Sequence, residues 1–67
     1  MKLTLKQARR LKDESQKNLA EILNVTVKTY RRLEKNPNLI TIEQARKISD
    51  YLEIPCDEIF FASNYSI

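Results

Sequence analysis

The chain has 67 residues, of which 42% are hydrophobic and 31% charged, as in a globular protein with one small domain. It has no glycine, no histidine and one cysteine, which excludes glycine-rich phosphate loops, histidine acid–base or metal chemistry, and a disulfide framework. The net charge is +3, but residues 1–35 carry +6 and residues 36–67 carry −3. This asymmetry favours a polyanionic partner, the alternative being ordinary surface charge that keeps the protein soluble.

Five short helices are expected from capping residues and apolar spacing. Thr4 and Gln7 have the spacing of a capping box at the first helix, and Thr41 with the glutamine three residues on repeats it. Ser15 and Thr26 are expected N-caps of the second and third helices, because their hydroxyls can accept free N–H groups at a helix start. The expected helices span residues 5–13, 16–23, 27–35, 42–52 and 56–61.

Apolar residues that recur at helical spacing define the expected core. Those expected to be buried are Leu5, Ala8, Leu19, Leu23, Tyr30, Leu33, Ile42, Ala45, Ile48 and Leu52. Tyr30 is large for its position, so its hydroxyl is expected to reach water or a hydrogen-bond partner.

The helix expected over 27–35 separates positive charge from apolar side chains. At about 100° per residue, Tyr30 and Leu33 lie on one side and four cations fill an arc on the other. The four cations are Lys28, Arg31, Arg32 and Lys35. Like charges four residues apart repel weakly in an isolated helix, and a polyanion along this face would remove that penalty. The alternative is a solvated cationic face without a partner.

Two short helices joined by a tight turn, the second basic on its exposed face, describe a helix-turn-helix. The chain resembles the phage repressor/Cro (XRE-type) family across 15–36, where it reads SQKNLAEILNVTVKTYRRLEKN, and across 41–60, where it reads TIEQARKISDYLEIPCDEIF. The resemblance implies an all-α, compact five-helix lambda-repressor-like DNA-binding domain over 1–61. Its helix-turn-helix would be formed by 16–23 and by 27–35, the recognition helix.

The resemblance also implies which residues contact DNA. Gln16 would bond a phosphate at a helix start, while Val27 would meet a thymine methyl and Lys28 the edge of a guanine. Thr26 would act first as a cap and second as a contact. The full set of expected DNA-binding residues is Gln16, Lys17, Thr26, Val27, Lys28, Arg31, Arg32, Lys35, Asn36 and Asn38. Whether Arg31 and Arg32 reach bases or phosphates is left open.

Arg9 and Glu34 would form a structural ion pair, again by resemblance. The family often has glycine at four positions that are occupied here by Asp13, Asn24, Asn36 and Glu53. Asp and Asn enter the left-handed backbone region readily, but Glu53 does so less well, and we expect the join before the last helix to differ. Glu14 stands where the family usually has an apolar residue.

These features predict a double-stranded DNA-binding regulator of transcription, a Cro-like repressor that acts as a homodimer on a palindromic operator. Phe61, Tyr65 and Ile67 are the expected dimer contact, the last two lying in a tail at 62–67. An antitoxin or a restriction-modification controller would share these residues. A protein-interaction module that has lost DNA binding is the alternative from a different class.

Several absences are expected as well. Nothing in the sequence indicates an enzyme, a metal site, a cofactor or a small-molecule ligand. No stretch has the roughly 18 apolar residues of a membrane span, and the N-terminus does not resemble a secretory signal. The expected location is the cytoplasm, on the nucleoid when DNA is bound.

Overall fold

The computed structural model describes residues 3–59, and every element in that part of the chain is helical. The elements are α1 (Leu5–Leu11), α2 (Gln16–Leu23), α3 (Val27–Lys35), the short 3-10 helix η1 (Pro37–Leu39), α4 (Ile42–Leu52) and α5 (Cys56–Ile59). The bounds of α2, α3 and α4 are those expected from the sequence. α1 ends two residues early, and the expected end of α5 at residue 61 lies outside the described residues.

The helix starts are fixed by side-chain caps. The hydroxyls of Thr4, Ser15, Thr26 and Thr41 each accept a hydrogen bond from the backbone N–H three residues on. At α1 and α4 the glutamine in the third helical position returns a bond to the cap backbone, completing capping boxes. A cap of this kind contributes about 1 kcal/mol to stability, which helps helices as short as these to form.

Three joins use the left-handed backbone region without glycine. Asp13, Asn24 and Glu53 have φ near 59°, 59° and 58°. Glu53 therefore adopts the left-handed conformation that favours glycine, even though it carries a Cβ. Asn36 differs, with φ −129°, because the residue before a proline is driven toward extended backbone and Pro37 follows it.

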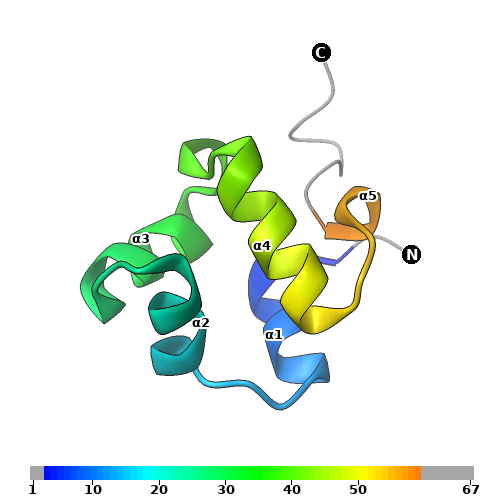
Figure 1. The fold of residues 1–67 in the computed structure, drawn as a ribbon, viewed down its shortest axis with the longest axis horizontal. Helices are drawn as coiled ribbons and strands as arrows, with labels where there is room; N and C mark the ends of the chain where they lie inside the picture. The colour runs from blue at the N-terminus through cyan, green and yellow to red at the C-terminus, as the bar shows by residue number, and fades with distance from the viewer. Residues whose placement is uncertain (1–2, 60–67) are drawn as a thin grey trace.

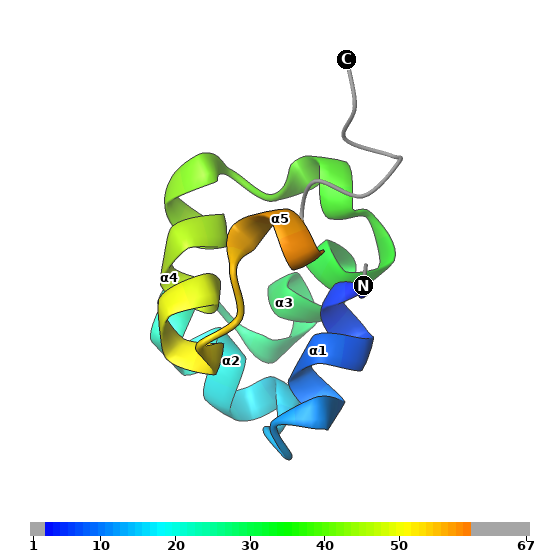
Figure 2. The same ribbon diagram turned by 90° about the vertical axis from the view of Figure 1, so that its right-hand side faces the viewer.

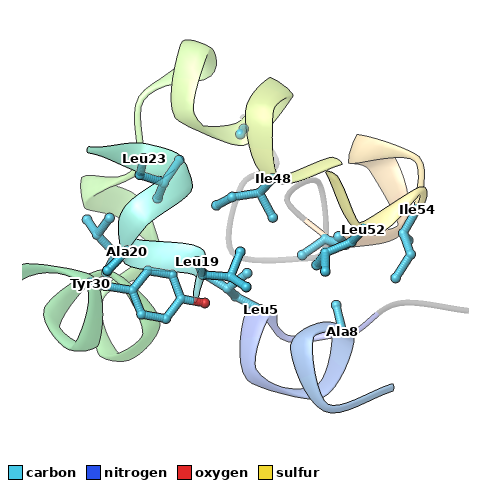
Figure 3. Packing of buried hydrophobic residues seen from close by; sticks show 12 residues of the cluster. Leu5, Ala8, Leu19, Ala20, Leu23, Tyr30, Ile48, Leu52 and Ile54 are labelled. Atoms are coloured by element: carbon cyan, nitrogen blue, oxygen red, sulfur yellow. The ribbon is translucent and has the colours of Figure 1, made fainter. Parts of the chain in front are cut away.

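The core is one cluster drawn from all five α-helices, with Tyr30, Leu19, Ile48 and Leu52 fully buried. Figure 3 shows Tyr30 projecting inward from α3 toward the side chains of α2 and α1. Ile42 was expected in this cluster, and that expectation is wrong, since its side chain is 76% exposed. The helical repeat places Ile42 about 120° around α4 from the buried Ile48, and it is the first residue after the cap.

The arrangement leaves α2 and α3 at one end of the molecule. Figure 1 shows α2 and α3 together at one end of the long axis and α5 at the other end. Helix α4 lies in the middle, between this pair and α5. Turned by 90°, α5 is seen in front, near the start of α1, with α3 behind it (Figure 2). Helix α3 therefore lies at the end of the molecule away from α5.

Replacing Glu53 with glycine should stabilise the protein. A non-glycine residue in the left-handed region costs about 1–2 kcal/mol, and glycine removes the clash at some entropic cost in the unfolded chain. We expect Glu53→Gly to raise the free energy of unfolding by about 1 kcal/mol, measured by urea denaturation.

Glu53→Ala is the matched control, because alanine removes the carboxylate but keeps the Cβ that causes the clash. It should give no comparable gain. Equal stability of the glycine and alanine variants would mean that backbone conformation at this join is not a source of strain.

Candidate nucleic-acid interface

The exposed side of α3 is cationic. Lys28, Arg31, Arg32 and Lys35 are all exposed, and none of them forms an ion pair within residues 3–59. Tyr30 and Leu33 are buried on the opposite side. The acidic residue of this helix, Glu34, is turned inward, so it does not neutralise the exposed charges. Positive charge is therefore available along about two turns of helix.

Val27 lies at the edge between these two sides. Its expected role is contact with a thymine methyl, and its side chain is half-buried and packs against the core. Residues three apart are neighbours on a helix surface, so Val27 sits one turn before Tyr30 and shares its inner edge. Part of the valine side chain remains accessible at the start of α3.

The other expected contact residues lie around the ends of α2 and α3. Thr26 caps α3: its hydroxyl accepts from the Thr29 N–H at 3.1 Å and donates to the Thr29 hydroxyl at 3.0 Å. Asn36 ends α3, where its side-chain amide donates to the Arg32 carbonyl at 3.3 Å. Lys17 and Asn38 are exposed. The fold thus gathers the ten expected residues around the helix-turn-helix and the turn that follows it.

A buried ion pair joins α1 to the end of α3. Arg9 Nε donates to Glu34 Oε2 at 2.7 Å, and the two side chains are 10% and 6% exposed. The same guanidinium donates to the Glu14 carbonyl at 2.9 Å. Burial alone would raise the pKa of Glu34, but hydrogen bonds to Arg9 and other neighbours hold the pKa below its ordinary value of 4.5. The carboxylate therefore stays ionised when the protein is folded.

Gln16 links this pair to the cationic side of α3. Its side-chain nitrogen donates to Glu34 Oε1 at 3.1 Å, and its side-chain oxygen accepts from Arg31 Nε at 3.1 Å. Neither bond could be predicted from the sequence, because Gln16 lies 18 residues from Glu34, 15 residues from Arg31 and on a different helix from both. The expected role of Gln16 was a phosphate contact alone.

The Tyr30 hydroxyl lies close to the same carboxylate. It is buried and makes no hydrogen bond within the described residues, although it lies near enough to Glu34 and Arg9 for the three groups to shift one another's pKa. One Glu34 oxygen accepts a hydrogen bond from Arg9 and the other accepts one from Gln16. Burial, and after it the nearby Glu34, raises the pKa of Tyr30, so the phenol stays neutral.

Glu14 also has a partner that the sequence did not indicate. Its Oε1 accepts from Tyr51 Oη at 3.0 Å and from Asn18 Nδ2 at 3.1 Å. The Tyr51 bond ties the α1–α2 connection to the last turn of α4. An acidic residue at a usually apolar position is thus accommodated by hydrogen bonding.

Comparison with known families agrees with this arrangement. The sequence pattern of one family, described as Helix-turn-helix, matches residues 5–59. No curated protein and no solved structure matches the chain. The matched span runs from the first residue of α1 to the last of α5, so it includes both the cationic helix and the Arg9–Glu34 pair.

Two other kinds of site are not found in the described part of the chain. Its helices lack the length and apolar character needed to cross a bilayer. Residues 3–59 also contain no group of three or more Cys, Asp or Glu side chains placed to hold a metal ion.

The Arg9–Glu34 pair should make stability depend on pH. The folded state keeps Glu34 ionised to lower pH than the unfolded chain does, so acidification below about pH 5 protonates the unfolded state first and lowers the free energy of unfolding. Glu34→Gln should lose about 3–5 kcal/mol at neutral pH, because it leaves Arg9 buried without its counter-ion. It should also show a shallower decline in acid, measured by urea denaturation from pH 3 to 7.

Glu21→Gln is the control, since Glu21 is an exposed carboxylate on α2. It should leave both the neutral stability and the acid slope near those of the unsubstituted protein. Stabilities of the two variants within about 1 kcal/mol of each other would show that the Arg9–Glu34 pair acts like an exposed one.

Proposed function

The chain belongs to the XRE-type helix-turn-helix family, and from that membership we propose that it is a sequence-specific, Cro-like repressor of transcription. The family is one of DNA-binding regulators rather than enzymes. The observation that carries the proposal is the α3 surface, where four exposed cations have no acidic partner within residues 3–59. Such a surface suits the phosphates and base edges of double-stranded DNA.

In this proposal α3 enters the major groove and α2 crosses the backbone. Phosphates supply most of the affinity, through Gln16, Lys17, Lys35, Asn36 and Asn38. Base reading falls to the start of α3. Lys28 is exposed and can reach guanine O6 and N7, and the accessible part of Val27 can meet a thymine methyl.

We also propose that the protein acts as a homodimer on a palindromic operator, in the cytoplasm where the nucleoid lies. One recognition helix covers only a few base pairs, so specificity normally needs two copies about 34–36 Å apart. The proposed contact residues Phe61, Tyr65 and Ile67 lie outside the described residues. They follow α5, whose place at the far end from α3 would leave the DNA-facing surface open (Figure 1).

The rival from another class is a protein-interaction module that has lost DNA binding. Acidic or apolar residues on the exposed side of α3 would favour it, and that side carries four cations instead. An antitoxin or a restriction-modification controller would use the same DNA-binding residues. Selection of bound sequences from random duplex DNA tests binding, half-site symmetry and spacing together, and failure to enrich any sequence would overturn the proposal.

Lys28 and Lys35 should have different effects on DNA binding. Lys28→Ala should cost about 1–3 kcal/mol on the selected operator and flatten preference at one base position. Lys35→Ala should weaken all sequences alike and lower the salt slope by about one unit. Titrations of operator and scrambled duplexes at several salt concentrations measure both quantities. An unchanged preference in Lys28→Ala would show that this residue does not read bases.

Removing the tail should weaken cooperative binding. A chain cut after residue 61 that also carries Phe61→Ala should bind a palindrome without cooperativity but remain folded, because Ile59 and the rest of the core are kept. Circular dichroism checks the fold, and titration of full-palindrome and half-site duplexes measures cooperativity. Full cooperative affinity in this folded variant would place the dimer contact elsewhere.

A further inference from the structure

Arg31 and Arg32 are adjacent exposed cations on α3, but their side chains differ in hydrogen bonding. Arg31 Nε is held by the side-chain oxygen of Gln16, the first residue of α2. The Arg32 side chain makes no hydrogen bond within residues 3–59. One guanidinium is therefore tethered to the neighbouring helix and the other is not.

The chemistry of the amide fixes the direction of this tether. Glu34 accepts from the nitrogen of Gln16, so the oxygen is left for Arg31. The reversed amide would set its oxygen against the Glu34 carboxylate and its nitrogen against the guanidinium, and both contacts are unfavourable. Because Arg9 holds Glu34 in the core, the orientation of Gln16 is determined from inside the protein.

The tether draws the Arg31 guanidinium toward the start of α2. Its Nε is used by Gln16, which leaves the terminal amino groups free to donate. The amide nitrogen of Gln16 also keeps a second hydrogen. In a helix-turn-helix the first helix crosses the DNA backbone, so a cation held at its start lies beside phosphates rather than over base edges.

We propose that Gln16 is a positioning residue for Arg31, and that Arg31 so held is a phosphate contact and not a base-reading residue. This inference rests on the proposed DNA-binding function. It assigns sequence-independent affinity to Arg31 and leaves Arg32 as the arginine free to approach bases. It also makes the contribution of Arg31 to binding depend on Gln16.

DNA titration tests the assignment. Arg31→Ala should lower the slope of log K against log salt by about one unit and weaken operator and scrambled duplexes by the same factor. Gln16→Met should also weaken both duplexes, and the double variant should lose less than the product of the two single losses, because the residues act as a unit. Lys47→Ala, which removes an exposed cation of α4, is the control and should leave operator binding unchanged.

Two results of these titrations would overturn the proposal. One is a change of base preference at a single position in Arg31→Ala. The other is a double variant whose loss equals the product of the single losses, which would mean that Gln16 acts on DNA independently of Arg31.

A second measurement needs no DNA. In amide and guanidinium NMR spectra, the Arg31 Nε–H should exchange slowly with water in the unsubstituted protein and rapidly in Gln16→Met. Equal exchange in both proteins would refute the tether. Failure of the unsubstituted protein to bind any duplex, with the Arg31 Nε–H still protected, would instead overturn the proposed function and the phosphate assignment with it.

Discussion

The buried carboxylate of Glu34 must be surrounded by hydrogen-bond donors, and this need holds three helices of the domain together. Glu34 is taken out of water at the end of α3, and an ionised group in such a place must be surrounded by donors. Arg9 comes from α1 and Gln16 from the start of α2, so three helices meet at its two oxygens. The angle between α2 and α3, which defines a helix-turn-helix, is therefore tied to hydrogen-bond geometry as well as to apolar packing.

This ion pair helps α3 to remain helical although the cations on its exposed side repel one another. Its exposed side gathers four like charges, which repel one another. Its inner side carries Tyr30, Leu33 and Glu34, whose packing and ion pairing hold the helix in place. The Tyr30 hydroxyl is buried beside this ion pair and makes no hydrogen bond within residues 3–59, and burial keeps its phenol neutral.

What could be predicted from the sequence was governed by local rules. The starts of α1, α2, α3 and α4 depend on a hydroxyl that accepts a hydrogen bond from the N–H three residues on, so these four starts could be predicted from the sequence. Ile42 was misplaced because apolar spacing does not show where neighbouring helices end. The hydrogen bonds of Gln16 to Arg31 and of Glu14 to Tyr51 join residues that are distant in the chain. Helical periodicity relates only residues a few positions apart, so it cannot predict such pairs. The roles on DNA stay predictions.

The placement of charge along the molecule also bears on how it approaches a duplex. The basic helix α3 lies at one end of the long axis, and α5, which carries Asp57 and Glu58, lies at the other (Figure 1). The protein is thus an electric dipole as well as a net cation. In the field of DNA such a dipole turns its positive end forward before contact, so encounters in the wrong orientation are short-lived. Added salt would weaken this rotational guidance together with the attraction itself.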